Sequence, residues 1–527
     1  MGDDVDAYLA DVDKLLDAAA FFEERVGQLR AAEPALRGAK ELLARTCARC
    51  AEKLRALLDA HARDVAALPP PGSEPPATLP PPVDAAALPA AAKLVAHLAS
   101  VGDDAHEEAF VACRSAALDA ALRRQGADKL APQEAPRLPP EALGERALQW
   151  ARRCRWAVAL LQAEAPLAAA LLPPDAAPEA LAAVADATLR GVCAYGEAVA
   201  SSRRSADRLF AFVDVHSAAA AELPALRAAV GEEAACEALD RLEALRDAAG
   251  DAAAEAYADL EASVGREDRR PAGPDGTVHP LTAATMATLR RLFQMPHLFD
   301  MLTGVNDPPS PPPPQPQRRS KRDAPPPPPV PASEEALEEV GAAALRVIVA
   351  LHSALEARAR GCKAPGLREL FLLNNVAYVT RAVRRTPLLL GALGEDWARA
   401  QDELADGHAE ALLAATWGAA AAELRDTRGL DARSLGVKDR ERVKDKFRTF
   451  NEALDAAGAA MPHWSVPDEA LREQLRERLR QAVLAPYEAL YDAFADSSFT
   501  KFKEKYVKIA PGDADRVFQS FFEGLRE

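Results

Sequence analysis

The fold is decided by residues 435–525, which read LGVKDRERVKDKFRTFNEALDAAGAAMPHWSVPDEALREQLRERLRQAVLAPYEALYDAFADSSFTKFKEKYVKIAPGDADRVFQSFFEGL. Apolar residues recur in this stretch every three or four positions, which is the period of an amphipathic α-helix. Three helices are therefore predicted, one after another. Their apolar faces are formed by Val443, Phe447, Phe450 and Leu454; then by Leu471, Leu475, Leu479, Val483, Tyr487, Leu490 and Phe494; and finally by Val517, Phe518, Phe521, Phe522 and Leu525.

Two prolines mark the second of these helices. Pro467 precedes Asp468 and Glu469, and this order is typical of a helix start, where a missing N–H costs nothing and acids meet the positive end of the dipole. Pro486 lies inside the apolar pattern, so we expect a kink there.

Basic residues gather in the same stretch. The first helix carries Lys438, Arg440, Arg442, Lys444, Lys446 and Arg448 on its other faces. The segment Thr500–Ala510, between the second and third helices, carries Lys501, Lys503, Lys505 and Lys508 against one acid, Glu504.

Composition supports a helical chain with an acidic body. Of 527 residues, 49% are apolar but only 5% are aromatic, and alanine, the strongest helix former, fills the difference. The formal net charge of −16 argues against nucleic-acid binding. Residues 432–527 contain 17 basic and 17 acidic side chains, so residues 1–431 carry the whole net charge. A neutral end with clustered lysines is compatible with contact to an anionic surface.

The rest of the chain is predicted to be helical around two proline-rich stretches. We expect helices over 4–66, then around 91–101, 104–125, 139–163, 176–202, 204–219, 222–249 and 251–264, with a break at Gly250. The predicted organisation is an N-terminal helical segment (1–66), a Pro-rich loop (67–92), helical bundles (93–306), a Pro-rich disordered insertion (307–332) and C-terminal helical bundles (333–527).

The two proline-rich stretches have different possible roles. Residues 68–82, LPPPGSEPPATLPPP, cannot be helical and are predicted to form a solvated loop. Residues 308–331 contain two proline tracts around the basic knot RRSKR. This second stretch fits a disordered polyproline-II loop, or a docking site for a proline-recognising domain such as SH3 or profilin.

No pattern for catalysis, a cofactor or a metal stands out. The chain has no G-x-S-x-G, H-E-x-x-H, P-loop, dinucleotide or EF-hand signature. Cys47 and Cys50 form a C-x-x-C without a second pair, and no run approaches the ~20 continuous apolar residues of a membrane span. Seven scattered cysteines are typical of a reduced intracellular protein. His279, alone at a helix entry, is interpreted as a structural group, and no enzyme activity is predicted.

Asn374 lies on the apolar stripe of the segment LFLLNNVAYV, together with Leu367, Phe371 and Tyr378. A buried amide without partners costs roughly 1–3 kcal/mol. We therefore expect its side chain to tie down a neighbouring loop or helix.

Five pieces resemble, in order, the seventy-kilodalton subunit of the exocyst, the vesicle-tethering complex: DGTVHPLT at 275–282, LFLLNNVAYVTRAV at 370–383, VKDRERVKDKFRTFN, HWSVPDEALRE, and KEKYVKI with the aromatic helix after it. The resemblance implies an all-α, elongated rod of consecutive antiparallel helical bundles, similar to cullin repeats. It also implies a cytoplasmic protein, peripheral at the inner face of the plasma membrane, that tethers secretory vesicles with other exocyst subunits. Small GTPases of the Rho type are further partners that the resemblance implies.

The resemblance also assigns the binding residues. Lys505 and Lys508 match phosphoinositide-contacting lysines of the family by their place in KEKYVKI. Lys501 and Lys503 are their neighbours, and Lys438, Arg440, Lys444 and Lys446 lie where the family places further basic contacts for phosphatidylinositol 4,5-bisphosphate. The alternatives are that these side chains form a solvated face paired with acids, or that the chain is a stand-alone adaptor acting through its proline-rich loop. The family joins its partners through an N-terminal coiled coil, and we expect this sequence to lack it, either because it was lost or because Met1 is not the true start.

Overall fold

Helices make up almost all of the regular structure in this computed structural model, which describes residues 2–28, 32–102, 104–126, 131–231, 235–266, 272–295, 334–426 and 430–524. In those ranges the only β-type pairings are two isolated bridges, Ala62–Val83 and Ser465–Glu523. The predicted all-α fold class is confirmed. By their internal contacts the residues form two units, Met1–Asp259 and Leu260–Glu527.

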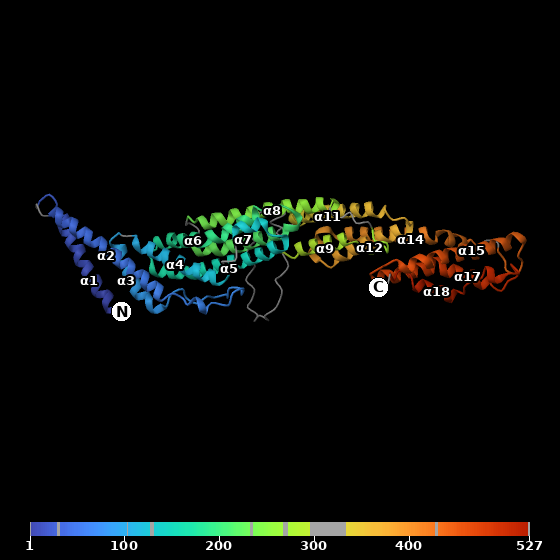
Figure 1. Cartoon of the computed structure of the whole chain (residues 1–527), viewed down its shortest axis with the longest axis horizontal. Coiled ribbons are helices and arrows are strands. Elements are labelled where there is room, and N and C mark those ends of the chain that lie inside the picture. The colour runs from blue at the N-terminus through green and yellow to red at the C-terminus, as the bar shows by residue number, and fades with distance from the viewer. Residues whose placement is uncertain are drawn as a thin grey trace. The chain divides into compact units, whose positions relative to one another are not determined.

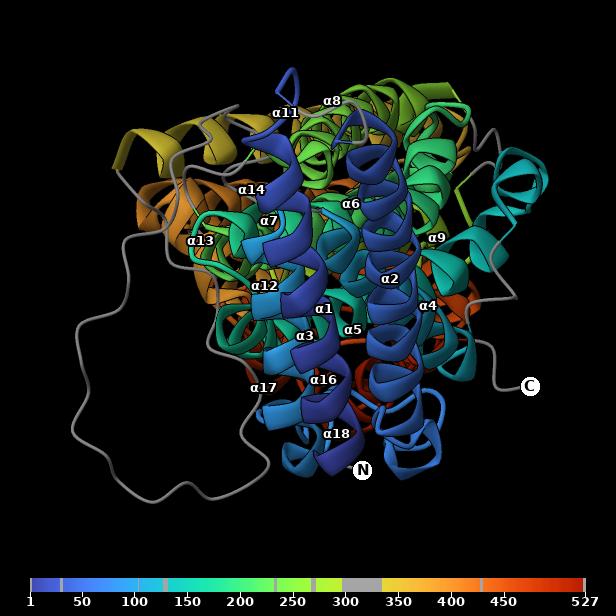
Figure 2. The same ribbon diagram turned by 90° about the vertical axis from the view of Figure 1, so that its left-hand side faces the viewer.

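The N-terminal unit is a set of alanine-rich helices around two tryptophans. Trp150 and Trp156 are fully buried, and α1 and α2 run side by side (Figure 2). Small residues let the helices approach closely: a Cβ at Gly196 would lie 2.6 Å from the side chain of Leu245. The helices are α1 (Gly2–Glu23), α2 (Ala32–Ala60), α3 (Leu88–Ser100), α4 (Ala105–Arg124), α5 (Pro140–Leu171), α6 (Ala176–Ala200), α7 (Leu209–Val230) and α8 (Glu237–Arg266).

The first proline-rich stretch is the largely exposed, solvated loop that we expected, and it is fastened to α5. It is non-helical. Trp156 Nε1 on α5 donates to the carbonyl oxygen of Ser73 at 2.8 Å, and Arg152 donates to that of Gly72 at 3.2 Å. An extended proline-rich backbone makes no internal hydrogen bonds, so its carbonyl groups remain available to the donors of α5. Helix α3 begins at Leu88, inside the span assigned to the loop.

Two helix boundaries also differ from the prediction. Gly250 does not break a helix, because α8 continues through it. A Cβ at this position would lie 3.1 Å from Nδ1 of His216, so the glycine makes room for a packed ring. Helix α7 likewise runs to Val230, through the gap predicted between residues 219 and 222.

The C-terminal unit is built around aromatic side chains. Trp417 on α14 meets Phe450 on α15 at 6.4 Å between ring centroids, and Arg442 near the start of α15 pairs with Asp426 just after the end of α14, so these two helices are antiparallel (Figure 1). The helices are α9 (Pro280–Leu292), α11 (Glu334–Ala359), α12 (Pro365–Arg384), α13 (Pro387–Leu393), α14 (Glu395–Arg425), α15 (Val437–Ala460), α16 (Glu469–Leu479), α17 (Ala485–Phe494) and α18 (Pro511–Gln519).

Two of the predicted C-terminal helices differ from the observed ones: the second is divided by a π-helical turn and the third is shorter. Ahead of Pro486, a π-helical turn at Arg480–Leu484 joins α16 to α17. Helix α18 ends at Gln519, so Phe521 and Phe522 are buried beyond the helix rather than on it. The predicted insertion at 307–332 and Leu525 lie outside the described residues.

Two segments, Ala206–Val230 and Leu337–Ala359, are long and apolar enough by composition to cross a membrane, although no continuous apolar run of that length occurs in the sequence. Their most apolar windows are 67% and 50% buried against other residues. Core helices of globular proteins have the same length and composition, and both segments pack in that way here.

Candidate functional site

Three of the recognised sequence pieces meet at α12. Asn374 Nδ2 donates to the carbonyl oxygen of Gly276 at 2.7 Å and to that of Ser465 at 2.8 Å. Ser465 N in turn donates to the carbonyl oxygen of Asp275 at 2.8 Å. The predicted structural role of Asn374 is confirmed: one buried amide joins two loops that are almost two hundred residues apart in the chain.

The neighbouring amide fixes the start of α9. Asn375 Oδ1 accepts from the backbone N–H of His279 at 3.0 Å and from Oγ1 of Thr282 at 2.6 Å. His279 Nδ1 accepts from the N–H of Leu281, so this histidine caps the helix, as predicted for a structural group. Among the described residues, no group of three side chains is placed to hold a metal ion.

The segment Thr500–Ala510, called here the lysine loop, is anchored on its inner side by aromatic residues and an amide. Phe499, just before it, stacks on Phe447 of α15 at 5.6 Å. Asn451 Nδ2 donates to the carbonyl oxygen of Tyr506 at 2.8 Å, and Tyr487 Oη donates to that of Ile509 at 2.6 Å. Burial raises the pKa of Tyr487, so its hydroxyl keeps the proton that it donates.

The lysines of the loop, unlike these anchors, lie largely at the surface. Lys501, Lys505 and Lys508 are exposed and Lys503 is half-buried. Lys508 has an acid nearby, with its Nζ 3.9 Å from a carboxylate oxygen of Asp455. The loop therefore presents a concentrated positive charge on a fixed backbone.

Helix α15 adds cations to one side of the lysine loop. The Nζ atoms of Lys444 and Lys505 lie 6.0 and 5.9 Å from the ring centroid of Tyr506, so the structure brings these two lysines to one ring. Lys444 also donates to Glu441 at 2.8 Å, which lowers the pKa of that carboxyl group. Arg440 is exposed one turn before Lys444 on the same face.

Lys438 and Lys446 are placed differently. Lys438 is exposed at the start of α15, but its position in the helical repeat is on another face from Lys444. Lys446 is only 1% exposed, and its Nζ donates to the carbonyl oxygen of Glu423 on α14. A surface role for Lys446 is therefore wrong. The signal was in the sequence, because Lys446 lies one turn from both Val443 and Phe450 on the buried arc.

Sequence reasoning missed two exposed apolar side chains beside these cations. Phe502 in the lysine loop is 65% exposed and Val437, the first residue of α15, is 81% exposed. Phe502 could have been noticed because lysines flank it on both sides, outside any helical stripe. Asn451, which holds the loop, gave no signal beyond its place on the face of α15 that carries Lys444.

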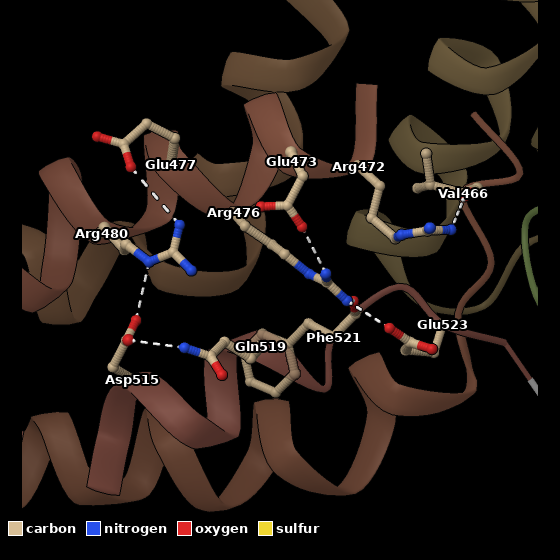
Figure 3. A network of polar contacts seen from close by, with 10 residues as sticks. All are labelled: Val466, Arg472, Glu473, Arg476, Glu477, Arg480, Asp515, Gln519, Phe521 and Glu523. Carbon is tan, nitrogen blue, oxygen red and sulfur yellow. Dashed lines mark hydrogen bonds and ion pairs between the residues drawn. The ribbon is translucent and has the colours of Figure 1, made fainter. Parts of the chain in front are cut away.

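The chain end that follows the lysine loop is fastened by arginines of α16 and the π-turn (Figure 3). Arg476 Nη2 donates to the carbonyl oxygen of Phe521 at 2.8 Å and to Glu523 at 2.9 Å, and Arg480 Nε donates to Asp515 of α18 at 2.8 Å. Its bond with Asp515 raises the pKa of Arg480. Because α18 is held in this way, both ends of the lysine loop are fixed.

The comparisons with known proteins agree with this architecture. Residues 149–520 match the family model for the C-terminal part of the Exo70 exocyst complex subunit. The chain is 24% identical over 422 residues to the exocyst complex component EXO70A1 of Arabidopsis thaliana, covering 78% of this chain and 62% of that protein. It is 29% identical over 177 residues to the exocyst complex protein EXO70 of Yarrowia lipolytica, covering 33% of this chain and 28% of that protein.

A solved structure shows the same fold. The crystal structure of the S. cerevisiae exocyst component Exo70p matches 98% of this chain and 94% of its own with a TM-score of 0.61 at 14% identity. The chain spans about three fifths of the length of EXO70A1 and 45% of that of the A. thaliana exocyst component EXO70C2. Because the family model covers well over half of the chain, the protein belongs to the Exo70 family of exocyst subunits.

Proposed function

We propose that the chain serves as an exocyst subunit that tethers secretory vesicles to the plasma membrane, with its lysine loop on the anionic inner leaflet. The relatives named above are exocyst components, which supports the tethering role. The remaining helical surface would bind other exocyst subunits and a small GTPase of the Rho type. The observation that carries the membrane contact is the lysine loop itself, with four lysines on a backbone held by buried anchors.

The proposed contact consists of the lysine loop with Arg440 and Lys444 of α15, while Lys438 lies at its edge. A basic residue near an anionic leaflet contributes about 1 kcal/mol, so six of them give a reversible, salt-sensitive attachment. Phosphatidylinositol 4,5-bisphosphate suits this surface because one head group concentrates several negative charges. The acidic remainder of the chain, with its −16 net charge, would be repelled by the same leaflet, which favours contact through this end.

Vesicle flotation tests the proposal. Purified chain is mixed with phosphatidylcholine vesicles with and without phosphatidylinositol 4,5-bisphosphate over a range of salt concentrations. We expect flotation that depends on the phosphoinositide and fades with salt. The double variant Lys505→Glu/Lys508→Glu should bind at least about thirtyfold more weakly, because two lost contacts are worth about 2 kcal/mol and the new carboxylates are repelled by the leaflet.

The matched control is Arg360→Glu/Lys363→Glu, which changes the net charge equally at two positions after α11, outside the proposed contact. This variant should float like the wild type. Equal flotation of both variants, with folding intact by circular dichroism, would show that the lysine loop is not the binding surface. Co-purification with other exocyst subunits tests the tethering role separately.

A further inference from the structure

Phe502 is exposed although the loop that carries it is well anchored. The residue is 65% exposed, whereas Phe499, just before the loop, is buried and Tyr506 within it is half-buried. The backbone on either side is fixed, since Phe502 N–H donates to Oγ1 of Thr500 at 3.1 Å and Lys505 N–H donates to the carbonyl oxygen of Phe502 at 3.2 Å. The apolar interior at the start of this segment is filled by other rings, since Phe499 and Phe447 are buried and stack on each other.

Val437 repeats this pattern on α15. It is 81% exposed and is followed by two exposed cations, Lys438 and Arg440. Val437 and Lys444 are seven residues apart, so they lie on one face of the helix, separated by about 10 Å along its axis. That face is the one on which Lys444 meets Tyr506 of the lysine loop. An apolar residue therefore lies next to basic residues on both elements of the proposed contact.

We propose that Phe502 inserts into the lipid bilayer, with Val437 of α15 as a second apolar contact, while the lysines of the loop bind the head groups. This inference rests on the proposed function, and it assigns to the same site a second, apolar part of the binding energy. An exposed apolar ring between cations suits an interface where an anionic layer covers hydrocarbon. A protein groove could also receive Phe502, and the experiment below separates that outcome.

The two parts of the contact should respond differently to salt. Attraction between lysines and head groups is screened, with a Debye length of about 10 Å at 0.1 M and about 3 Å at 1 M salt. Burial of an apolar ring is not weakened by screening. Insertion therefore predicts a residual vesicle affinity at high salt that depends on Phe502 and not on the lysines.

Flotation of the full chain on phosphatidylcholine vesicles containing phosphatidylinositol 4,5-bisphosphate, at about 0.1 M and about 1 M salt, tests this prediction. Phe502→Ser should bind about tenfold more weakly at low salt and lose the residual binding at high salt, because one buried ring is removed. Phe502→Leu keeps an apolar side chain and should stay within about twofold of the wild type. Phe21→Ser, at a half-exposed phenylalanine of α1, is the matched control and should behave like the wild type.

A second measurement reports insertion directly. Phe502→Trp, compared with the wild type and its five tryptophans, should show extra fluorescence quenching by lipids that carry bromine near the head-group end of the acyl chains. Quenching equal to that of the wild type would overturn the proposal. So would Phe502→Ser that floats like the wild type at both salt concentrations, although the lysine-based contact would then stand.

Other outcomes separate the two proposals further. Wild-type chain that does not float even at low salt would overturn both the membrane contact and the insertion. Phe502→Ser that floats normally but no longer co-purifies with exocyst subunits would overturn insertion in favour of a protein groove. Thermal melting of each variant confirms that the fold is kept.

Discussion

At the scale of single residues, Asn374 joins two loops of the recognised pieces through one side chain. Its amide satisfies two carbonyl groups on loops that are far apart in the chain. We expect Asn374→Ala to destabilise the C-terminal unit by about 2–4 kcal/mol, because one buried and one partly buried carbonyl group lose their donor. Urea unfolding followed by circular dichroism measures this change.

The control for Asn374 is Gln474→Ala, at an exposed amide on α16, which should change the free energy of unfolding by less than about 0.5 kcal/mol. A cost at Asn374 as small as that at Gln474 would mean that water replaces the amide. The two loops would then be held by their own packing, and the shared sequence pieces would need another explanation.

A second residue-scale prediction concerns the buried ion pair between α4 and α5. Arg114 donates from Nε and Nη2 to the two carboxylate oxygens of Glu164 at 2.8 Å each, and the side chains are 3% and 0% exposed. Burial lowers the pKa of nearby Arg63, while the charge of Glu164 acts in the opposite direction. One carboxylate therefore balances two guanidinium groups.

Because of this imbalance, removing the carboxylate should lower the unfolding free energy more than removing the Arg114 guanidinium. Glu164→Gln leaves the buried cation of Arg114 without its carboxylate, with half-buried Arg63 nearby, and should cost about 3–5 kcal/mol of unfolding free energy. Arg114→Met leaves Glu164 with Arg63 as its partner and should cost less. Chemical denaturation of the two variants decides the order, and a larger loss for Arg114→Met would show that Arg63 gives no compensation.

At the scale of whole elements, the spacing of the apolar residues predicted most of the helices and their buried faces. The stripe of Val443, Phe447 and Phe450 became the buried face of α15, because a helix repeats every 3.6 residues wherever it packs. The spacing of apolar residues within one helix could not show which neighbouring helix packs against its other faces. Gly250 was predicted to break a helix because propensity ignores the ring of His216 that needs its space. The burial of Lys446 depends on a carbonyl group of α14, which belongs to a different helix.

The candidate site was predictable to a similar degree. The lysines of the loop were visible as a cluster, and the structure leaves three of them exposed. The burial of the aromatic anchors and the role of Asn451 could not be predicted from sequence. Phe502 was marked only by the lysines on either side of it, and phenylalanine is more often buried than exposed. Tertiary contacts between the lysine loop and α15 decide which of these aromatic residues faces solvent.

An element-scale prediction follows from the contact between α11 and α13. A Cβ at Gly341 on α11 would fall 2.9 Å from the carbonyl carbon of Ala392 and closer still to its oxygen. Backbone cannot move aside as a side-chain tip can, so Gly341→Ala should cost about 1–3 kcal/mol of unfolding free energy. Gly407→Ala on α14, where the added Cβ meets nothing within 4 Å, should instead stabilise the protein by up to about 1 kcal/mol. Thermal melting of both variants tests the pair, and equal shifts would contradict the close approach.

At the scale of the whole molecule, the two units differ in their buried thiols. Six of the seven cysteines belong to the N-terminal unit and are buried, while Cys362 in the other unit is half-buried. Burial raises the pKa of Cys113 to about 11 and that of Cys193 to about 12. It also raises the pKa of Cys154 and Cys236. These thiols therefore stay protonated at a pH where the unfolded chain, with thiol pKa values of about 8.5, has already lost its protons.

The sign of the resulting pH dependence is fixed. A pKa that is raised by folding contributes stability that is fully present below the unfolded value and is lost as the pH rises through the folded one. We expect the unfolding free energy of the N-terminal unit to fall as the pH rises above about 8.5 and to keep falling toward the folded pKa values of about 11 and about 12, approaching about 1.4 kcal/mol per pH unit for each such thiol. Urea unfolding at about pH 7.5 and about pH 9.5, on either side of the unfolded thiol pKa, measures the loss. Cys154→Ala/Cys193→Ala should reduce the difference between the two pH values, whereas Cys362→Ala, in the other unit, should leave the difference for the N-terminal unit nearly unchanged, although burial raises the pKa of that thiol as well. An unaltered pH dependence in the double variant would show that other groups cause the alkaline loss.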